Sequence, residues 1–326
     1  MKNQILNPDT NNTRTTIRMK HRHLRHLLCL PLCAAAFLTT ASAQMLLLEY
    51  TFDDYTAGST TTANTGALGS AADLTMYDTN HSTSNRVGTP AGLYSAADTG
   101  LGGAGRAFNG TGANGMGGST TAYTGNRAQT TATISTGVIQ SFTITGWFKP
   151  DGSVIGNGAK ILDTTGSALV VSSSANGRLG LYVNGNTVSG NASNYYATGT
   201  WVFFAITYDG ALTANNVNFY IGSESSNSLA KVGDALTLNK GSLTLTDVSL
   251  ALGNSVGSNS RPFDGLIDNI RIYTNNTTDS GILTLGQIES LRATGSIVPE
   301  PATVTLLAGG AILGVALTLR RRARLS

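Results

Sequence analysis

The chain has 326 residues, of which only 12% are charged and 39 are glycine. Low charge with abundant Gly, Ser, Thr and Asn indicates extracellular β-structure with long loops, not a helical enzyme. Ten of the 21 Lys and Arg residues lie in the first 43 or the last seven residues, so the segment between them is acidic overall. A nucleic-acid-binding protein needs a basic face on its folded domain, so the composition excludes that class.

The first 43 residues have the pattern of a secretory signal peptide. A basic segment begins at Met19, an apolar stretch (LLCLPLCAAAFLTT) follows, and small residues lead up to Ala43. This order predicts cleavage between Ala43 and Gln44, with Met19 as the true start. Both cysteines, Cys29 and Cys33, lie in the apolar stretch. The mature chain is therefore expected to have neither disulfides nor thiolate chemistry.

The next segments differ in how clearly they predict structure. Residues 46–52 (LLLEYTF) are apolar and β-prone, and an acidic pair follows them. Residues 55–133 are mostly Gly, Ala, Thr, Ser and Asn, a composition that leaves brief strands between loops and disorder both open. Seventy unstructured residues within one domain would be unusual.

From residue 134 onward the pattern is that of strands and tight turns. SFTITGWFKP (141–150) alternates, with Phe142, Ile144 and Phe148 on one face and Trp147 on the other. TWVFFAITYDG (200–210) is apolar on both faces, which is typical of a central strand. Further strands are expected at 159–163, 168–172, 178–183, 216–222, 248–253 and 265–275. The fold class predicted is all-β, a two-sheet antiparallel sandwich.

Two local signals predict a hairpin and a short helix in the second half of the chain. Asn184 followed by glycine is a strong hairpin signal. Near the end, Thr284 precedes Gln287 by three residues, which is the spacing of a helix capping box, and Ile288 and Leu291 share one face. One short helix is therefore expected after the last strand.

The last 31 residues (296–326) have three consecutive parts. Pro299-Glu300-Pro301 is followed by an apolar run of 18 residues (302–319) and by four arginines. As a helix, this run would be about 27 Å long and would just span a bilayer core of about 30 Å. The arginines should stay in the cytoplasm, which places the body outside. An ordinary C-terminal membrane anchor is the alternative interpretation.

This order of parts resembles the PEP-CTERM sorting signal of Gram-negative bacteria. The resemblance implies an exosortase-type membrane peptidase as processing partner, acting at Pro299, Glu300 and Pro301. It also implies export, a C-terminal transmembrane helix in the inner membrane before processing, and a final place at the cell surface or in extracellular matrix.

Four segments of the body carry a second resemblance. They are EYTFDD (49–54), SFTITGWFKPDG (141–152), TWVFFAITYDG (200–210) and RPFDGLIDNIRIYTN (261–275). In this order they resemble the laminin-G-like, or concanavalin A-like, jelly-roll family. The resemblance implies one such domain over 44–295. The family includes sugar-binding, protein-binding and purely structural members, so its fold does not give a function.

The resemblance also implies a calcium ion between the first and last strands, at Asp53 and Asp268, with Asp54 and Asp264 as secondary candidates. Asp268 lies at even spacing from Leu266 and Ile270 and is therefore expected to point with core residues, where a carboxylate needs a partner. The alternative is that Asp268 pairs with an arginine or backbone amides and that Asp53 only begins a turn.

For sugar binding, exposed aromatics near amide or acid groups are needed. Tyr195 and Tyr196 form the best patch, Tyr123 and Asn126 a weaker one, and packing of the tyrosine pair at the sandwich rim is the alternative. Catalysis is not expected, because the Glu-x-Asp-x-x-Glu cluster of related glucanases does not occur. We therefore expect a secreted, non-catalytic adhesion or glycan-binding protein that meets extracellular polysaccharide. A structural matrix protein and a degenerate glycoside hydrolase are the alternatives.

Overall fold

The computed structural model describes residues 44–56, 59–78, 86–87, 93–97, 99–110, 125–151, 158–174, 177–190, 199–226, 228–258, 261–275 and 281–297. The predicted signal peptide, Tyr123, the pair Tyr195 and Tyr196, and the tail with Pro299, Glu300 and Pro301 lie outside these ranges. In the described part of the chain, no helix is long and apolar enough to cross a bilayer.

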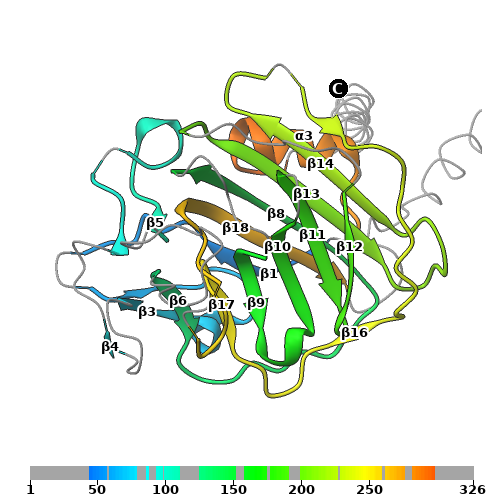
Figure 1. Cartoon of the computed structure of the whole chain (residues 1–326), viewed down its shortest axis with the longest axis horizontal. Coiled ribbons are helices and arrows are strands. Elements are labelled where there is room, and N and C mark those ends of the chain that lie inside the picture. Colours follow the sequence, from blue (N-terminus) through cyan, green and yellow to red (C-terminus); the bar gives the residue numbers. More distant parts are fainter. Residues whose placement is uncertain are drawn as a thin grey trace, which may run out of the picture. The chain divides into compact units, whose positions relative to one another are not determined.

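Two antiparallel sheets pack face to face (Figure 1). Sheet A has the order β1-β18-β8-β13-β14-β15, with β5 also paired to β18. Its strands are β1 (Met45–Tyr50), β5 (Phe108–Asn109), β8 (Ser141–Pro150), β13 (Val202–Asp209), β14 (Val217–Ser223), β15 (Ala230–Lys231) and β18 (Gly265–Asn275). The predicted all-β sandwich with two antiparallel sheets is thus confirmed.

Sheet B has the order β12-β11-β10-β9-β17-β6-β3-β2, with β4 also paired to β3. Its strands are β2 (Thr61–Thr62), β3 (Leu74–Asp78), β4 (Arg86–Val87), β6 (Arg127–Thr130), β9 (Lys160–Thr164), β10 (Leu169–Ser174), β11 (Arg178–Val183), β12 (Asn186–Ser189) and β17 (Leu250–Leu252). A separate pair joins β7 (Val138–Ile139) to β16 (Leu243–Thr244). Short 3-10 turns are η1 (Gly69–Ala72), η2 (Leu101–Gly103) and η3 (Thr165–Ser167).

The alternation in β8 and β13 decides which side chains enter the core between the sheets. Phe142, Ile144 and Phe148 lie in that core, whereas Trp147 lies in a second apolar cluster. Strand β13 pairs with β8 on one side and β14 on the other, and it contributes side chains to both clusters. The predicted central strand is therefore confirmed.

The second cluster lies on the face of sheet A that points away from sheet B. It is covered by Leu101 of η2 and by α3 (Leu285–Thr294), whose Ile288 and Leu291 are buried. The capping box at Thr284 and Gln287 is formed as predicted, and Gly295 ends the helix in the left-handed conformation.

The segment for which composition left two outcomes open forms strands. Residues 55–133 contribute β2, β3, β4, β5 and β6, which extend both sheets. The longest of them, β3, has five residues, so none is long enough to show a period in the sequence.

The last strand carries a bulge that the sequence pattern missed. In the ladder with β8, Asp268 pairs with Trp147 and Arg271 with Thr145, so Asn269 and Ile270 together face Gly146. Ile267 and Ile270 both enter the core, and Asp268 shares its face with Trp147. The expectation that Asp268 points with Ile270 is wrong, because the extra residue reverses the alternation between them.

Gly146 makes the bulge possible. A Cβ atom at this position would lie 2.3 Å from Ile270 Cδ1 and 2.8 Å from Phe204 Cε1. We predict that Gly146→Ala lowers the free energy of unfolding by about 1–3 kcal/mol, because it overpacks the core. Gly137→Ala is the control, since nothing lies within 4 Å of the added atom there. Urea midpoints that shift equally in both variants would show that Ile270 does not pack on Gly146.

Candidate functional site

The bulge places three polar side chains of β18 on the outer face of sheet A. Asp268 is 2% exposed, and its two carboxylate oxygens accept different backbone donors. Oδ2 accepts from the Leu101 amide at 3.1 Å, and Oδ1 accepts from the Asn269 amide at 2.7 Å and from its side-chain amide at 3.1 Å. The alternative interpretation of Asp268, pairing with backbone amides, thus describes its protein partners correctly.

The electrostatic surroundings of Asp268 are unfavourable for its ionised form. Burial is the largest cause, and together with the negative charge of nearby Asp53 it raises the pKa of Asp268 to about 7. The two backbone hydrogen bonds and the positive charge of Arg271 oppose this shift. The structure therefore brings together the two carboxylates that the sequence singled out.

A glycine-containing loop (the 99–106 loop) lies over these carboxylates and is held by three acidic side chains. The Leu101 amide binds Asp268, the Arg106 amide binds Asp53 at 3.3 Å, and the Gly102 amide binds Glu224 at 2.8 Å. Gly105 has a φ of 59°, and a Cβ there would lie only 1.9 Å from Asp53 Oδ1. Glycine at this position is therefore required for the close approach.

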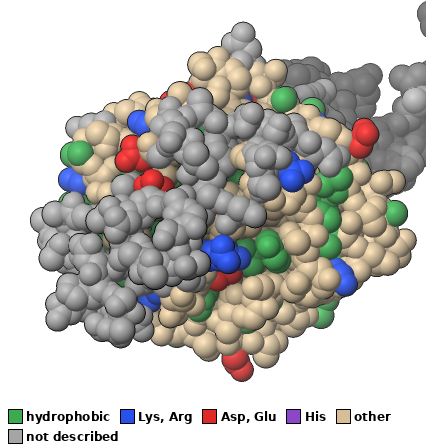
Figure 2. Space-filling view, viewed as in Figure 1, with side chains coloured by type: hydrophobic (Ala, Val, Ile, Leu, Met, Phe, Trp, Pro, Cys, Tyr) green, Lys and Arg blue, Asp and Glu red, His purple; other side chains and the backbone are tan. Residues whose placement is uncertain are grey.

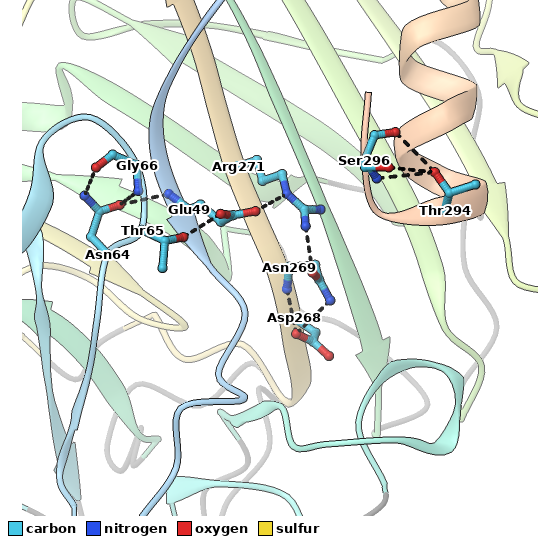
Figure 3. Close-up of polar contacts among 9 residues, drawn as sticks. All are labelled: Glu49, Asn64, Thr65, Gly66, Asp268, Asn269, Arg271, Thr294 and Ser296. Atoms are coloured by element: carbon cyan, nitrogen blue, oxygen red, sulfur yellow. Dashed lines mark hydrogen bonds and ion pairs between the residues drawn. The ribbon is translucent and has the colours of Figure 1, made fainter. Parts of the chain in front are cut away.

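A chain of polar contacts continues from Asp268 to the edge of the sheet (Figure 3). Asn269 Oδ1 accepts from Arg271 Nη2 at 3.1 Å, and Arg271 Nε binds Glu49 Oε1 at 2.7 Å. Thr65 also donates to Glu49. Burial opposes ionisation of Glu49, but the bonds from Thr65 and Arg271 outweigh it and hold the pKa of Glu49 below its usual value.

A cavity of about 510 Å³ lies beside this chain of contacts. Its floor is formed by Trp147, Asn269 and Arg271 of sheet A. Leu101 and Gly102 of the 99–106 loop line one side, and the last turn of α3 lines another. Leu101, Trp147 and Leu291 make part of the lining apolar, while Glu224, Ser226, Asn269, Arg271, Arg292 and Thr294 provide polar groups.

The remaining sequence candidates lie elsewhere. Asp54 accepts from the Thr62 hydroxyl at 2.7 Å and from the Ala63 amide at 2.6 Å, so it organises a turn. Asp264 lies near Asp151, and burial followed by the charge of Asp151 raises its pKa. Asn126 is buried and donates to the Asn109 carbonyl at 2.8 Å, so its expected exposure for sugar contact is wrong.

Sequence reasoning missed Glu49, Arg271 and the 99–106 loop as parts of the site. Glu49 and Arg271, which carry opposite charges, lie 222 positions apart in the sequence. Only the pairing of β1 with β18 brings them together. In the view of Figure 2, the charged side chains of the described residues stand singly or in small groups among uncharged polar surface.

Comparison with known proteins agrees with this architecture. Residues 121–282 match the family model described as the concanavalin A-like lectin/glucanases superfamily, of laminin G type. Residues 121–282 are therefore similar to a laminin G, concanavalin A-like lectin/glucanase domain, the family that the four segments of the body resemble. A search of curated proteins found no match.

Two solved structures illustrate the likeness. Domain 4 of AbnA, a GH43 extracellular arabinanase from Geobacillus stearothermophilus, in complex with arabinotriose, is 18% identical; the alignment covers 77% of this chain and 99% of that chain, with a TM-score of 0.46. The heptameric SAP-like pentraxin from Limulus polyphemus is 14% identical, with 60% of this chain and 83% of that chain covered and a TM-score of 0.39.

We predict that Glu49→Gln lowers the free energy of unfolding at pH 7 by about 1–3 kcal/mol, because it leaves the buried Arg271 without its anionic partner. The folded-state pKa of Glu49 lies below the unfolded value of about 4.3. Its stabilisation is therefore present above that value and is lost as the pH falls through the folded pKa. Urea unfolding at several pH values measures the gap between variant and wild type.

The control for this prediction is Asp234→Asn, which neutralises an exposed carboxylate. It should leave stability within about 0.5 kcal/mol of wild type at every pH. If the gap caused by Glu49→Gln stayed constant into acid, the ion pair would not be its source.

Proposed function

We propose that this chain is an exported, non-catalytic glycan-binding protein and that its glycan site is the cavity beside Asp268. The observation that carries the proposal is the β18 bulge, which places Asn269 and Arg271 on the outer face of sheet A at the floor of that cavity, next to Asp268. The match to the lectin/glucanase superfamily supports the general class. An adhesive role at the cell surface or in extracellular polysaccharide follows from this function.

The size and lining of the cavity suit a sugar. Its volume of about 510 Å³ lies in the range of about 300–1,000 Å³ that is usual for small-ligand sites. Sugars present an apolar ring face and a rim of hydroxyl groups. The half-buried Leu101 matches the first, and Asn269 and Glu224 match the second.

A calcium ion bound by Asp53 and Asp268 would stabilise this site. Calcium prefers carboxylate and carbonyl oxygens, and each carboxylate oxygen has lone pairs beyond those used by the backbone amides. A divalent cation would also offset the repulsion between the two acids. The described residues contain no cluster of three or more His, Cys, Asp and Glu side chains, so backbone carbonyls and water would complete the ligand set.

The export route rests on the two ends of the chain. A signal peptide cleaved between Ala43 and Gln44, and a PEP-CTERM tail with Pro299, Glu300 and Pro301 processed by an exosortase-type peptidase, together deliver the domain to the outside. Gln44 begins the described region, and its side chain accepts from Gln287 Nε2 at 3.2 Å.

The calcium proposal predicts that the full-length protein melts at a higher temperature in about 1 mM calcium than in EGTA, because the ion binds only the folded state. Asp268→Asn should abolish most of this shift, whereas Asp234→Asn, which neutralises an exposed carboxylate elsewhere on the chain, should keep it. Differential scanning calorimetry gives the measurement. Equal melting temperatures of the wild type with and without the chelator would contradict calcium binding.

The glycan proposal predicts that the full-length protein binds a subset of polysaccharides on a glycan array and releases no sugar from them. Ala293→Trp fills the mouth of the cavity from an exposed position on α3 and should reduce binding at least tenfold. Leu285→Trp makes a similar change at the exposed start of the same helix and should bind normally. An array without any bound glycan would favour a structural matrix protein, and turnover of a polysaccharide would favour a glycoside hydrolase.

A further inference from the structure

We propose that the cavity on the outer face of sheet A takes a carboxylate-bearing sugar, a hexuronate unit of an acidic polysaccharide, and that the sugar carboxylate binds Nη1 of Arg271. This inference rests on the proposed glycan-binding function and adds the substrate class. It assigns the ligand carboxylate to an arginine of β18 and not to the ion expected at Asp53 and Asp268.

The first observation is the incomplete hydrogen bonding of a buried guanidinium. The Arg271 side chain is 7% exposed. Its Nε binds Glu49, and its Nη2 binds Asn269. Among the described residues, none accepts a hydrogen bond from Nη1, and Arg271 lines the cavity. Nη1 is not among the fully buried atoms that lack a partner, so it is open to the cavity and can donate to a ligand oxygen there.

The second observation is the distribution of charge around the cavity. Arg292 is a second guanidinium in the lining, and its partner Glu289 and the Arg271 partner Glu49 both lie outside the lining. The lining has one acidic residue, Glu224, which is exposed and binds the Gly102 amide. The Nε and Nη2 atoms of Arg292 bind Glu289, and its Nη1 binds the Ser223 carbonyl. Arg271 is therefore the guanidinium that can reach an anion in the cavity, and planar guanidinium groups match carboxylates in particular.

The third observation separates a sugar acid from an acidic peptide. Around Arg271 the lining offers several uncharged hydrogen-bonding side chains, namely Asn269, Ser226 and Thr294, together with the half-buried apolar Leu101. An aspartate or glutamate side chain supplies only its carboxylate. A hexuronate supplies a carboxylate, a ring face and two or more hydroxyl groups, so it matches all three kinds of lining group.

Calorimetric titration of the full-length protein tests this inference with three probes: a galacturonic acid trisaccharide, a glucuronic acid trisaccharide, and the galacturonic acid trisaccharide with its carboxylates methyl-esterified. At least one acidic probe should bind ten or more times tighter than the ester. Arg271→Lys keeps a cation for Glu49 but has no counterpart of Nη1, so it should remove this preference. Arg178→Lys on sheet B is the matched control and should keep it.

A second pair of variants leaves the buried ion pair of Arg271 and Glu49 intact. Ala293 is an exposed residue of α3 at the cavity. Ala293→Glu places a negative charge there and should weaken the acidic probe at least fivefold relative to Ala293→Gln, which has nearly the same shape. The two variants should bind the esterified probe equally.

Several outcomes would overturn the inference. If the acidic and the esterified trisaccharides bound equally tightly, the cavity would still be a glycan site, but it would not recognise the uronate carboxylate. A preference for the acid that persists in Arg271→Lys but disappears in EGTA would assign the carboxylate to calcium. An acidic pentapeptide that binds as tightly as the trisaccharide would make the partner a protein. If none of the sugars binds and the glycan array is also blank, the proposed function itself fails.

Discussion

The packing of β18 against Gly146 is the constraint on which the site depends. Two isoleucines, Ile267 and Ile270, enter the core from one strand with two residues between them, and a regular strand does not allow this. The extra residue is accommodated because Gly146 leaves room for the Ile270 side chain. The core thereby gains apolar burial, and the same bulge leaves Asn269 and Arg271 on the face where Asp268 lies.

That opposite face is unusual for a sandwich because it is also covered. Helix α3 and the 99–106 loop bury Trp147 and its neighbours in a second apolar cluster, and they leave a cavity between them. The loop has little apolar burial of its own beyond Leu101. Its backbone amides are instead fixed by Asp53, Asp268 and Glu224. These acids therefore hold one cavity wall in place, and two of them are the residues proposed to bind calcium.

Glu49 and Arg271 form a half-buried ion pair at this site. The pair joins β1 to β18 at the edge of sheet A, and Arg271 extends the contact to Asn269 and so to Asp268 (Figure 3). A buried arginine that is shared between a structural acid and an open cavity serves two purposes. Its Nε joins β18 to Glu49 of β1, its Nη2 binds Asn269 of the same strand, and its Nη1 is left for a ligand oxygen. The same residue thus positions the site and takes part in it.

The sequence by itself determined the fold class and the elements with strong local signals. The alternation in β8, the two-sided apolar β13, the hairpin at Asn184 and the capping box at Thr284 are all encoded within a few neighbouring residues. Asp53 and Asp268 were also found, through motifs that resemble a known family. The tertiary structure alone decided the direction of Asp268, the partner of Arg271 and the strands between 55 and 133. A bulge depends on which residue lies opposite, an ion pair across 222 positions depends on strand pairing, and strands of two to five residues are too short to carry a period of their own.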